Sequence, residues 1–168
     1  MEIEVAIERI VPRGFGIGFV EGLTVFVALA AKGDRVRVRI DQIKGKTAFA
    51  EIAEVIEPGA GRIGAPCKYF GECGGCDFQQ MTYEEQLSSK VDIIRDCLHR
   101  IGKIDLEREI EVIPSPAEFG YRSRAQWHLN GATREIGYYK RNSRDLVAIE
   151  KCPILVSELN NELVRLRT

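Results

Sequence analysis

Long apolar runs are absent from this sequence. No segment approaches the roughly 20 consecutive apolar residues that a membrane-spanning helix needs. The first residues, Met1–Arg9, alternate charged and apolar side chains, which is not the pattern of a secretory signal peptide. We therefore expect a cytoplasmic protein without a membrane partner, and we expect it to be a monomer.

A nucleotide-binding fingerprint is absent as well. Gly14, Gly16 and Gly18 do not have the spacing of a dinucleotide-binding loop. The segment that follows them is predicted to be a strand, so no helix N-terminus is available for a phosphate group. We therefore predict no nucleotide site in this region.

Residues 1–57 are predicted to form a small all-β domain. Ile3, Val5 and Ile7 alternate with acidic residues, which is the two-residue period of a half-buried strand. Further strand-like segments follow at short spacing, separated by glycine-containing turns. Five strands in so short a segment favour a closed β-barrel over an open sheet.

Three arginines alternate with apolar residues in one of these strands. Arg35, Arg37 and Arg39 are expected on the outer face of the barrel, because the residues between them are apolar. Two interpretations stay open. The arginines form a solvated strand face, or they form a ridge that contacts phosphate groups.

The rest of the sequence mixes α and β patterns, so the predicted fold class is α+β, mainly β. Residues 58–66 contain glycine, alanine and proline and are predicted to be a linker before a second domain, residues 67–168. Thr82 and Glu85 form a capping box, which predicts a helix that ends near Gly102. Strands are predicted over 108–113 and within 121–149, and an amphipathic helix closes the sequence.

Cysteines are clustered in a way that indicates a metal site. In a chain without an export signal, clustered cysteines are more often metal ligands than disulfides. Cys67, Cys73 and Cys76 lie within ten residues, and Cys152, which precedes a proline, is the natural fourth ligand. Cys97 lies beside the apolar stripe of the predicted helix and is expected to be a small buried residue. Zinc and a 4Fe-4S cluster both accept four thiolates; the presence of only one Cys-x-x-Cys pair favours iron–sulfur.

A basic stretch, residues 121–144, contains six Lys or Arg and one acidic residue, although the formal net charge of the chain is −1. Tyrosines and Trp127 are interleaved with these cations, a combination that suits RNA loops with unpaired bases. The alternative is an ordinary solvated hairpin with core aromatics. The predicted RNA-binding residues are Arg122, Arg124, Lys140, Arg141 and Arg144.

The order of these segments resembles the N-terminal half of the RNA (uracil-5-)-methyltransferases, above all the type that acts on 23S ribosomal RNA. One departure is Gln80, where the family pattern has a histidine. The resemblance rests on the small β-barrel, the motif Cys67-x5-Cys73-Gly-Gly-Cys76, the helix with Gln86 and Lys90, Cys152-Pro, and the segments that begin at Tyr121 and Ile136.

The resemblance implies a TRAM domain, which is an OB-like RNA-binding module, followed by a domain whose four cysteines hold a 4Fe-4S cluster. It implies ribosomal RNA as the partner. The domain of that family that binds S-adenosylmethionine and carries the catalytic residues has no counterpart in this sequence, so the chain is expected to be non-catalytic by itself. Two hypotheses from other classes stay open: a free-standing zinc-containing RNA-binding protein and a ferredoxin-type electron carrier.

Overall fold

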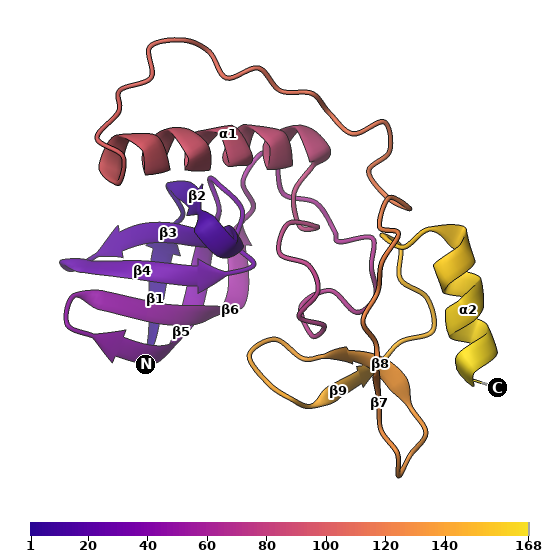
Figure 1. The fold of residues 1–168 in the computed structure, drawn as a ribbon. Coiled ribbons are helices and arrows are strands. Elements are labelled where there is room, and N and C mark those ends of the chain that lie inside the picture. Colours follow the sequence, from indigo (N-terminus) through magenta and orange to yellow (C-terminus); the bar gives the residue numbers. More distant parts are fainter. Residues whose placement is uncertain (168) are drawn as a thin grey trace. The chain divides into compact units, whose positions relative to one another are not determined.

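The computed structural model describes residues 1–167 and divides into two compact units (Figure 1). Unit 1 contains Met1–Gly64 and Gln80–Pro114. Unit 2 contains Ala65–Gln79 and the chain from Ser115 onward. Each unit is therefore built from two separate segments of the sequence, whereas the sequence predicted two consecutive domains joined by a linker.

Unit 1 is built on a curled sheet of six strands, in the order β1-β5-β6-β4-β3-β2. Neighbouring strands are antiparallel except β4 and β6, which are parallel. The predicted five-stranded barrel is thus a six-stranded curled sheet. Its strands are β1 (Glu2–Ala6), β2 (Arg9–Val11), β3 (Phe15–Val20), β4 (Leu23–Ala28), β5 (Arg35–Lys44) and β6 (Thr47–Glu57), with a 3-10 turn at Pro12–Gly14.

The additional strand is β2, and β3 begins at Phe15, where the sequence indicated a glycine-rich turn that leads into a strand at Phe19. Gly16 and Gly18 lie inside β3, whose glycines allow other segments to approach closely. A Cβ atom on Gly18 would lie 2.3 Å from the Ala6 carbonyl oxygen at the end of β1, and a Cβ on Gly16 would lie 2.8 Å from Ile7. Only glycine permits this approach, which lets the sheet curl until β1 and β3 are in contact.

The helix α1 (Tyr83–Arg100) begins and ends as the capping residues predicted. The Thr82 hydroxyl accepts a hydrogen bond from the backbone N–H of Glu85 at 3.3 Å. The reciprocal half of the capping box is not formed, because the Thr82 N–H donates instead to the Gly61 carbonyl. α1 contacts β2 and thus belongs to unit 1, although the sequence placed it in the cysteine-containing domain.

Residues 58–64 are fixed to the sheet of unit 1. The Asp34 carboxylate is fully buried and accepts hydrogen bonds from the backbone N–H of Gly59 at 2.9 Å and of Ala31 at 2.6 Å. It also accepts from Nη2 of Arg62 at 2.7 Å, and the same nitrogen donates to the Leu29 carbonyl. Residues 58–64 of the predicted linker are therefore held by a buried ion pair and are an ordered part of unit 1, and residues 65–66 belong to unit 2.

Unit 2 has little regular structure. A core of Ile136, Val147, Ile149 and Leu163 lies between its sheet and its helix, and Trp127 packs against this core. The strand predicted over 108–113, in unit 1, is irregular. None of the helices described is long and apolar enough to span a membrane. The elements of unit 2 are β7 (His128–Leu129), β8 (Ile136–Tyr139), β9 (Leu146–Ala148) and α2 (Ser157–Arg167).

Candidate metal centre and nucleic-acid surfaces

Three of the predicted ligands, Cys67, Cys73 and Cys76, lie in the first segment of unit 2, which contains no helix or strand. The loop is held by backbone hydrogen bonds; the Cys73 N–H, for example, donates to the Tyr69 carbonyl at 2.9 Å. Because its backbone groups are paired within unit 2, the loop has a defined course without regular secondary structure.

Gly74 positions this loop against β8. Its N–H donates to the Tyr139 carbonyl at 3.0 Å, and a Cβ on Gly74 would lie 3.2 Å from that same oxygen. A larger residue would therefore have to push the loop away from the sheet. From the sequence, Gly74 was explained only by the freedom of glycine to form a turn. In the structure it also packs closely against β8.

Cys152 reaches the same region from the segment after β9. Its backbone is held by Asn160 of α2, whose Oδ1 accepts from the Cys152 N–H at 2.8 Å and whose Nδ2 donates to the Cys152 carbonyl at 3.1 Å. Nδ2 also lies 3.1 Å from the Leu155 carbonyl. Asn160 was not identified from the sequence. Nothing in the sequence links an asparagine to a candidate ligand eight residues earlier, because the two meet only when α2 packs back against the segment that contains Cys152.

All four predicted ligands line one cavity in unit 2. The cavity wall is otherwise largely aromatic and aliphatic, and Arg122 is also part of it. Cys97, in α1 of unit 1, lies elsewhere. Within residues 1–167, no group of three or more His, Cys, Asp or Glu side chains forms a ready site for a single metal ion. The four cysteines that line the cavity are Cys67, Cys73, Cys76 and Cys152.

The surroundings of the thiols have opposing effects on their ionisation. Burial raises the pKa of the Cys73, Cys76 and Cys152 thiols, because a charged thiolate is poorly solvated there. Hydrogen-bond donors act in the opposite direction. They are the Gly75 N–H at Cys73, the Gln79 side chain at Cys76, and the N–H groups of Ile154 and Leu155 at Cys152.

These donors fit a set of iron–sulfur ligands. Hydrogen bonds to cysteine sulfur stabilise the thiolate and tune a bound cluster. A neutral thiol is only a weak acceptor and gains little from such donors. The residues present, four cysteines that line one largely apolar cavity of unit 2, are those that a 4Fe-4S cluster would need as ligands.

The predicted RNA-binding residues lie in different environments. Arg141 is engaged inside unit 2, with Nη1 donating to Asp77 at 2.6 Å and Nη2 donating to the Cys76 carbonyl at 2.8 Å. It braces the cysteine loop. Lys140 pairs with Glu72 at 3.2 Å. Arg122 lines the cysteine cavity, whereas Arg124 and Arg144 are exposed.

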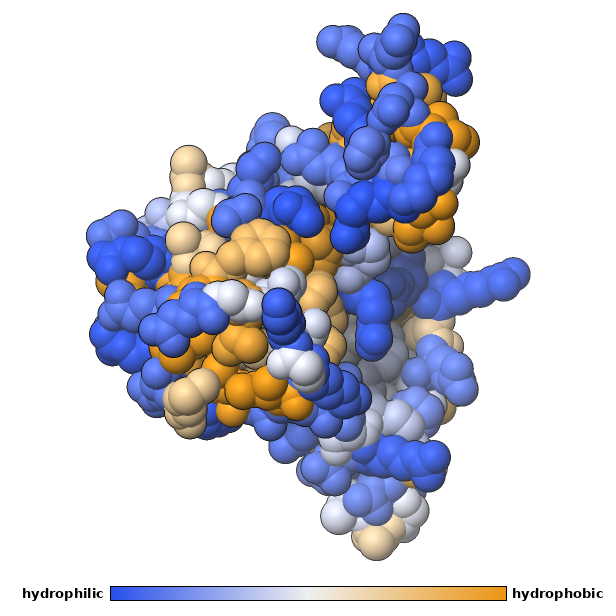
Figure 2. Space-filling model, turned by 90° about the vertical axis from the view of Figure 1, so that its left-hand side faces the viewer, coloured by the Kyte–Doolittle hydropathy of each residue, from blue (hydrophilic) through white to orange (hydrophobic). Residues whose placement is uncertain are grey.

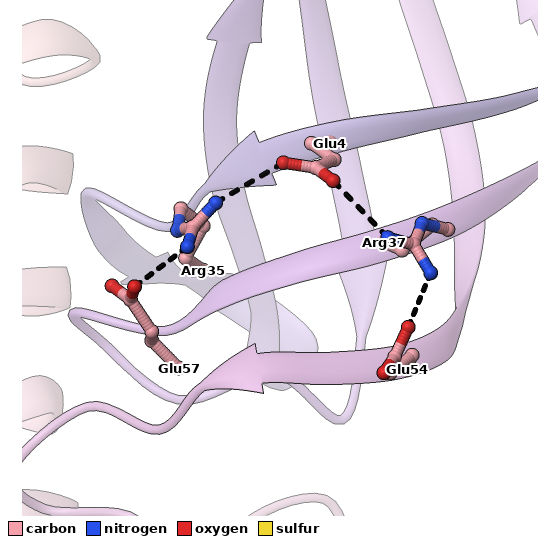
Figure 3. Close-up of polar contacts among 5 residues, drawn as sticks. All are labelled: Glu4, Arg35, Arg37, Glu54 and Glu57. Carbon is pink, nitrogen blue, oxygen red and sulfur yellow. Dashed lines mark hydrogen bonds and ion pairs between the residues drawn. The ribbon is translucent and has the colours of Figure 1, made fainter.

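The three arginines of β5 are paired with carboxylates, and Figure 3 shows the pairs of Arg35 and Arg37. Glu4 of β1 bridges Arg35 and Arg37, with both N–O distances at 3.2 Å. Glu57 lies 2.6 Å from Arg35, Glu54 also pairs with Arg37, and Arg39 lies 2.9 Å from Glu51. Because acidic residues of the neighbouring strands neutralise these cations, the arrangement favours the solvated-face interpretation over a phosphate-binding ridge.

Comparison with known proteins gives a family match for the N-terminal region and relatives for nearly the whole chain. Residues 1–53 match the TRAM domain family. The chain is 36% identical over 162 residues to an uncharacterized RNA methyltransferase of Aquifex aeolicus, covering 96% of this chain and 37% of that protein. It is 34% identical over 166 residues to the 23S rRNA (uracil(1939)-C(5))-methyltransferase of Pseudomonas putida, covering 96% of this chain and 36% of that protein.

A similar fold occurs in a solved structure, the tRNA (uracil-54, C5)-methyltransferase of Pyrococcus abyssi. The TM-score is 0.63 at 24% sequence identity, and the match covers 98% of this chain and 35% of that one. The chain thus spans little more than a third of the length of the relatives it matches. Residues 1–53 match the TRAM family, and nearly the whole chain is related in sequence to proteins named as RNA methyltransferases.

Proposed function

We propose that this chain is the RNA-binding, iron–sulfur portion of an S-adenosylmethionine-dependent ribosomal RNA uracil-5 methyltransferase, and that this portion is not catalytic by itself. The observation that carries the proposal is the sequence similarity over 96% of the chain to a 23S rRNA uracil-5 methyltransferase. The TRAM match of residues 1–53 supports the RNA-binding part.

A 4Fe-4S cluster would be held by Cys67, Cys73, Cys76 and Cys152. Four thiolates leave no open iron for a substrate, so the cluster would supply cross-links rather than catalysis. It would join the loop that precedes α1 to the segment that follows β9, and thus close a long excursion of the chain.

Zinc is the alternative occupant of the four thiolates. A single zinc ion requires all its sulfurs about 2.3 Å from one point, whereas each cysteine of a 4Fe-4S cluster binds its own iron. The presence of only one Cys-x-x-Cys pair is what supports the cluster, and metal analysis distinguishes the two.

The cofactor assignment is tested by purifying the chain without oxygen and measuring iron, acid-labile sulfide and the visible spectrum. We expect about four irons and four sulfides per chain, with the broad absorbance of a cluster. A colourless protein with one equivalent of zinc would contradict the assignment. An exposed, fully reversible redox couple without loss of structure would instead favour the electron-carrier hypothesis.

The RNA-binding assignment is tested by titrating fluorescently labelled ribosomal RNA fragments at several salt concentrations. We expect the affinity to fall with salt, because cations of the protein replace counterions on the phosphates. Arg124 and Arg144 are the predicted contacts of unit 2 that remain exposed. Replacing both by alanine should weaken binding and flatten the salt dependence, whereas Arg37→Ala, whose charge is already paired, should not.

A further inference from the structure

The outer surface of the unit 1 sheet has two unlike regions, and β6 contributes to both. Over β1, β5 and the C-terminal part of β6, arginines are paired with glutamates (Figure 3). Over β3, β4 and the N-terminal part of β6, the same face carries four phenylalanines together with the buried Ile17. The two regions therefore differ in what they offer to a partner.

The phenylalanines face outward because the residues between them fill the core. In β4, Phe26 lies between Val25 and Val27, both with no exposed surface. In β6, Phe49 lies between the buried residues Ala48 and Ala50. Side chains alternate across a strand, so both phenylalanines point away from the interior.

Three of these rings form one cluster. Phe26 and Phe49 are neighbours in the parallel β4–β6 pairing, and their rings are stacked with centroids 5.4 Å apart and planes at 21°. Phe15 of β3 meets both rings edge-on, with centroids 6.4 Å from each. Phe19, further along β3, is 50% exposed. We call Phe15, Phe19, Phe26 and Phe49 the aromatic platform.

The platform residues are partly or largely exposed in the described structure. In the view of Figure 2, which looks from the side where this sheet lies in Figure 1, apolar residues gather in a patch bordered by hydrophilic ones. Phe15, Phe26 and Phe49 are half-buried, and Phe19 is the platform residue that is largely exposed. The cluster is thus a partly exposed apolar patch, and such patches mark interaction surfaces.

Unpaired cations lie beside the platform. Lys44 pairs with Thr47 in the β5–β6 ladder and therefore shares the face of Phe49, two residues further along β6. Lys46 lies in the adjoining turn, and Arg13 lies two residues before Phe15. All three are exposed, and within residues 1–167 no carboxylate lies within ion-pair distance of them, in contrast to Arg35, Arg37 and Arg39.

We propose that the aromatic platform binds unpaired bases of single-stranded RNA, with Arg13, Lys44 and Lys46 contacting the adjacent phosphates. This inference rests on the proposed RNA-binding function and assigns it a place in unit 1. Flat rings bordered by free cations match the two parts of a nucleotide, since bases stack on aromatic faces and phosphates pair with cations.

The proposal requires the rings to be aromatic and not merely apolar. The full chain carrying Phe26→Leu and Phe49→Leu keeps an apolar surface but loses two stacking faces. We expect its affinity for a single-stranded RNA of about 12 nucleotides to fall at least about fivefold, with little change in the salt dependence. The matched variant with Phe26→Tyr and Phe49→Tyr keeps the rings and should bind like the unmodified chain.

The phosphate contacts have a different signature. Replacing Lys44 and Lys46 by alanine should reduce the slope of log affinity against log salt by up to about 0.7 for each lost contact. Arg37→Ala, on the paired region of the same sheet, should leave both affinity and slope unchanged. Thermal melting of each variant checks that unit 1 stays folded.

The outcomes separate the two proposals. If the unmodified chain binds no RNA, the proposed function itself fails. If it binds RNA and the Phe→Leu pair binds equally well, the aromatic platform is not the RNA site. A protein partner is then the alternative occupant of this face. Weaker binding of the leucine pair, together with retained binding of the tyrosine pair, supports the inference. Equal loss with leucine and with tyrosine contradicts it, because the aromatic face is then not what matters.

Discussion

The two units are stabilised in different ways. Unit 1 has a continuous sheet whose alternating valines, isoleucines and alanines are buried, and a buried ion pair that fixes its connecting segment. Unit 2 has three short strands, one helix and a small core around which loops converge on four cysteines. A unit with so small a core needs additional cross-links, and a metal cluster is one of the devices that provide them.

The largest expected effect is a loss of structure in unit 2 that leaves unit 1 folded. Cys73→Ser should abolish the cluster and unfold much of unit 2, while the sheet of unit 1 stays intact. Because α1 packs on β2, its amides should keep their protection against hydrogen exchange even though α1 lies between Cys76 and Cys152 in sequence. Iron analysis and hydrogen exchange measure both effects.

Cys97→Ser is the matched control for that variant, because Cys97 does not line the cavity. It should retain iron and the protection of unit 2. Full iron content in Cys73→Ser would contradict the ligand assignment, and loss of protection in α1 would contradict the division into units.

The next effect concerns unit 1 alone. Asp34→Ala removes the buried carboxylate that pairs with Arg62 and leaves the guanidinium, whose side chain is only 17% exposed, without its partner. Breaking a buried pair in this way costs about 3–5 kcal/mol. The free energy of unfolding of unit 1, from denaturant titration, should fall by that amount.

A matched control comes from an exposed pair in the same unit. Asp92→Ala breaks the ion pair with Lys32 at 3.3 Å, in which both side chains are more than 40% exposed. The cost should be at most about 1 kcal/mol. Equal losses for Asp34→Ala and Asp92→Ala would mean that residues 58–64 are not fixed by the buried ion pair.

A smaller effect is expected from loss of the Asn160 hydrogen bonds that hold the backbone of Cys152 in unit 2. Asn160→Ala leaves the backbone groups of Cys152 and Leu155 without their side-chain partner, which costs about 1–3 kcal/mol. The variant should lose iron to a chelator faster than the unmodified chain does. Asn161→Ala, at the exposed neighbouring position, should behave like the unmodified chain. Identical rates of iron loss for both variants would mean that Asn160 does not stabilise the cluster.

The smallest effect is expected on the paired face of the unit 1 sheet. Arg37→Ala removes exposed ion pairs with Glu4 and Glu54, and exposed pairs contribute about 0–1 kcal/mol. Thermal unfolding should therefore change little. A loss as large as that of Asp34→Ala would show that the arginine–glutamate pairs stabilise the sheet cooperatively.

Local patterns in the sequence predicted several elements correctly. Alternation along β1 and β5 predicted strands, and the Thr82 cap, the apolar spacing and Gly102 predicted α1, because such signals involve neighbouring residues only. The spacing of Cys67, Cys73 and Cys76 selected residues that the fold does bring together with Cys152. Their ligand role remains a prediction.

Other features could not be read from neighbouring residues. The first part of β3 was predicted to be a turn because Gly16 and Gly18 are explained only by the segments that approach them in space. α1 was assigned to the wrong partner segment, since the capping residues define a helix but not what it packs against. The expected strand over 108–113 has no partner to pair with in the described structure.

The β character of the N-terminal region and the α1 helix follow from the sequence alone, because periodicity and capping are properties of neighbouring residues. Which charges are free depends on the folded sheet. Arg35, Arg37 and Arg39 had the most conspicuous pattern, but neighbouring strands supply the glutamates that neutralise them. Arg13, Lys44 and Lys46 had no pattern, yet they lie beside a partly exposed aromatic cluster drawn from three strands, and pairing across strands is fixed when the sheet forms.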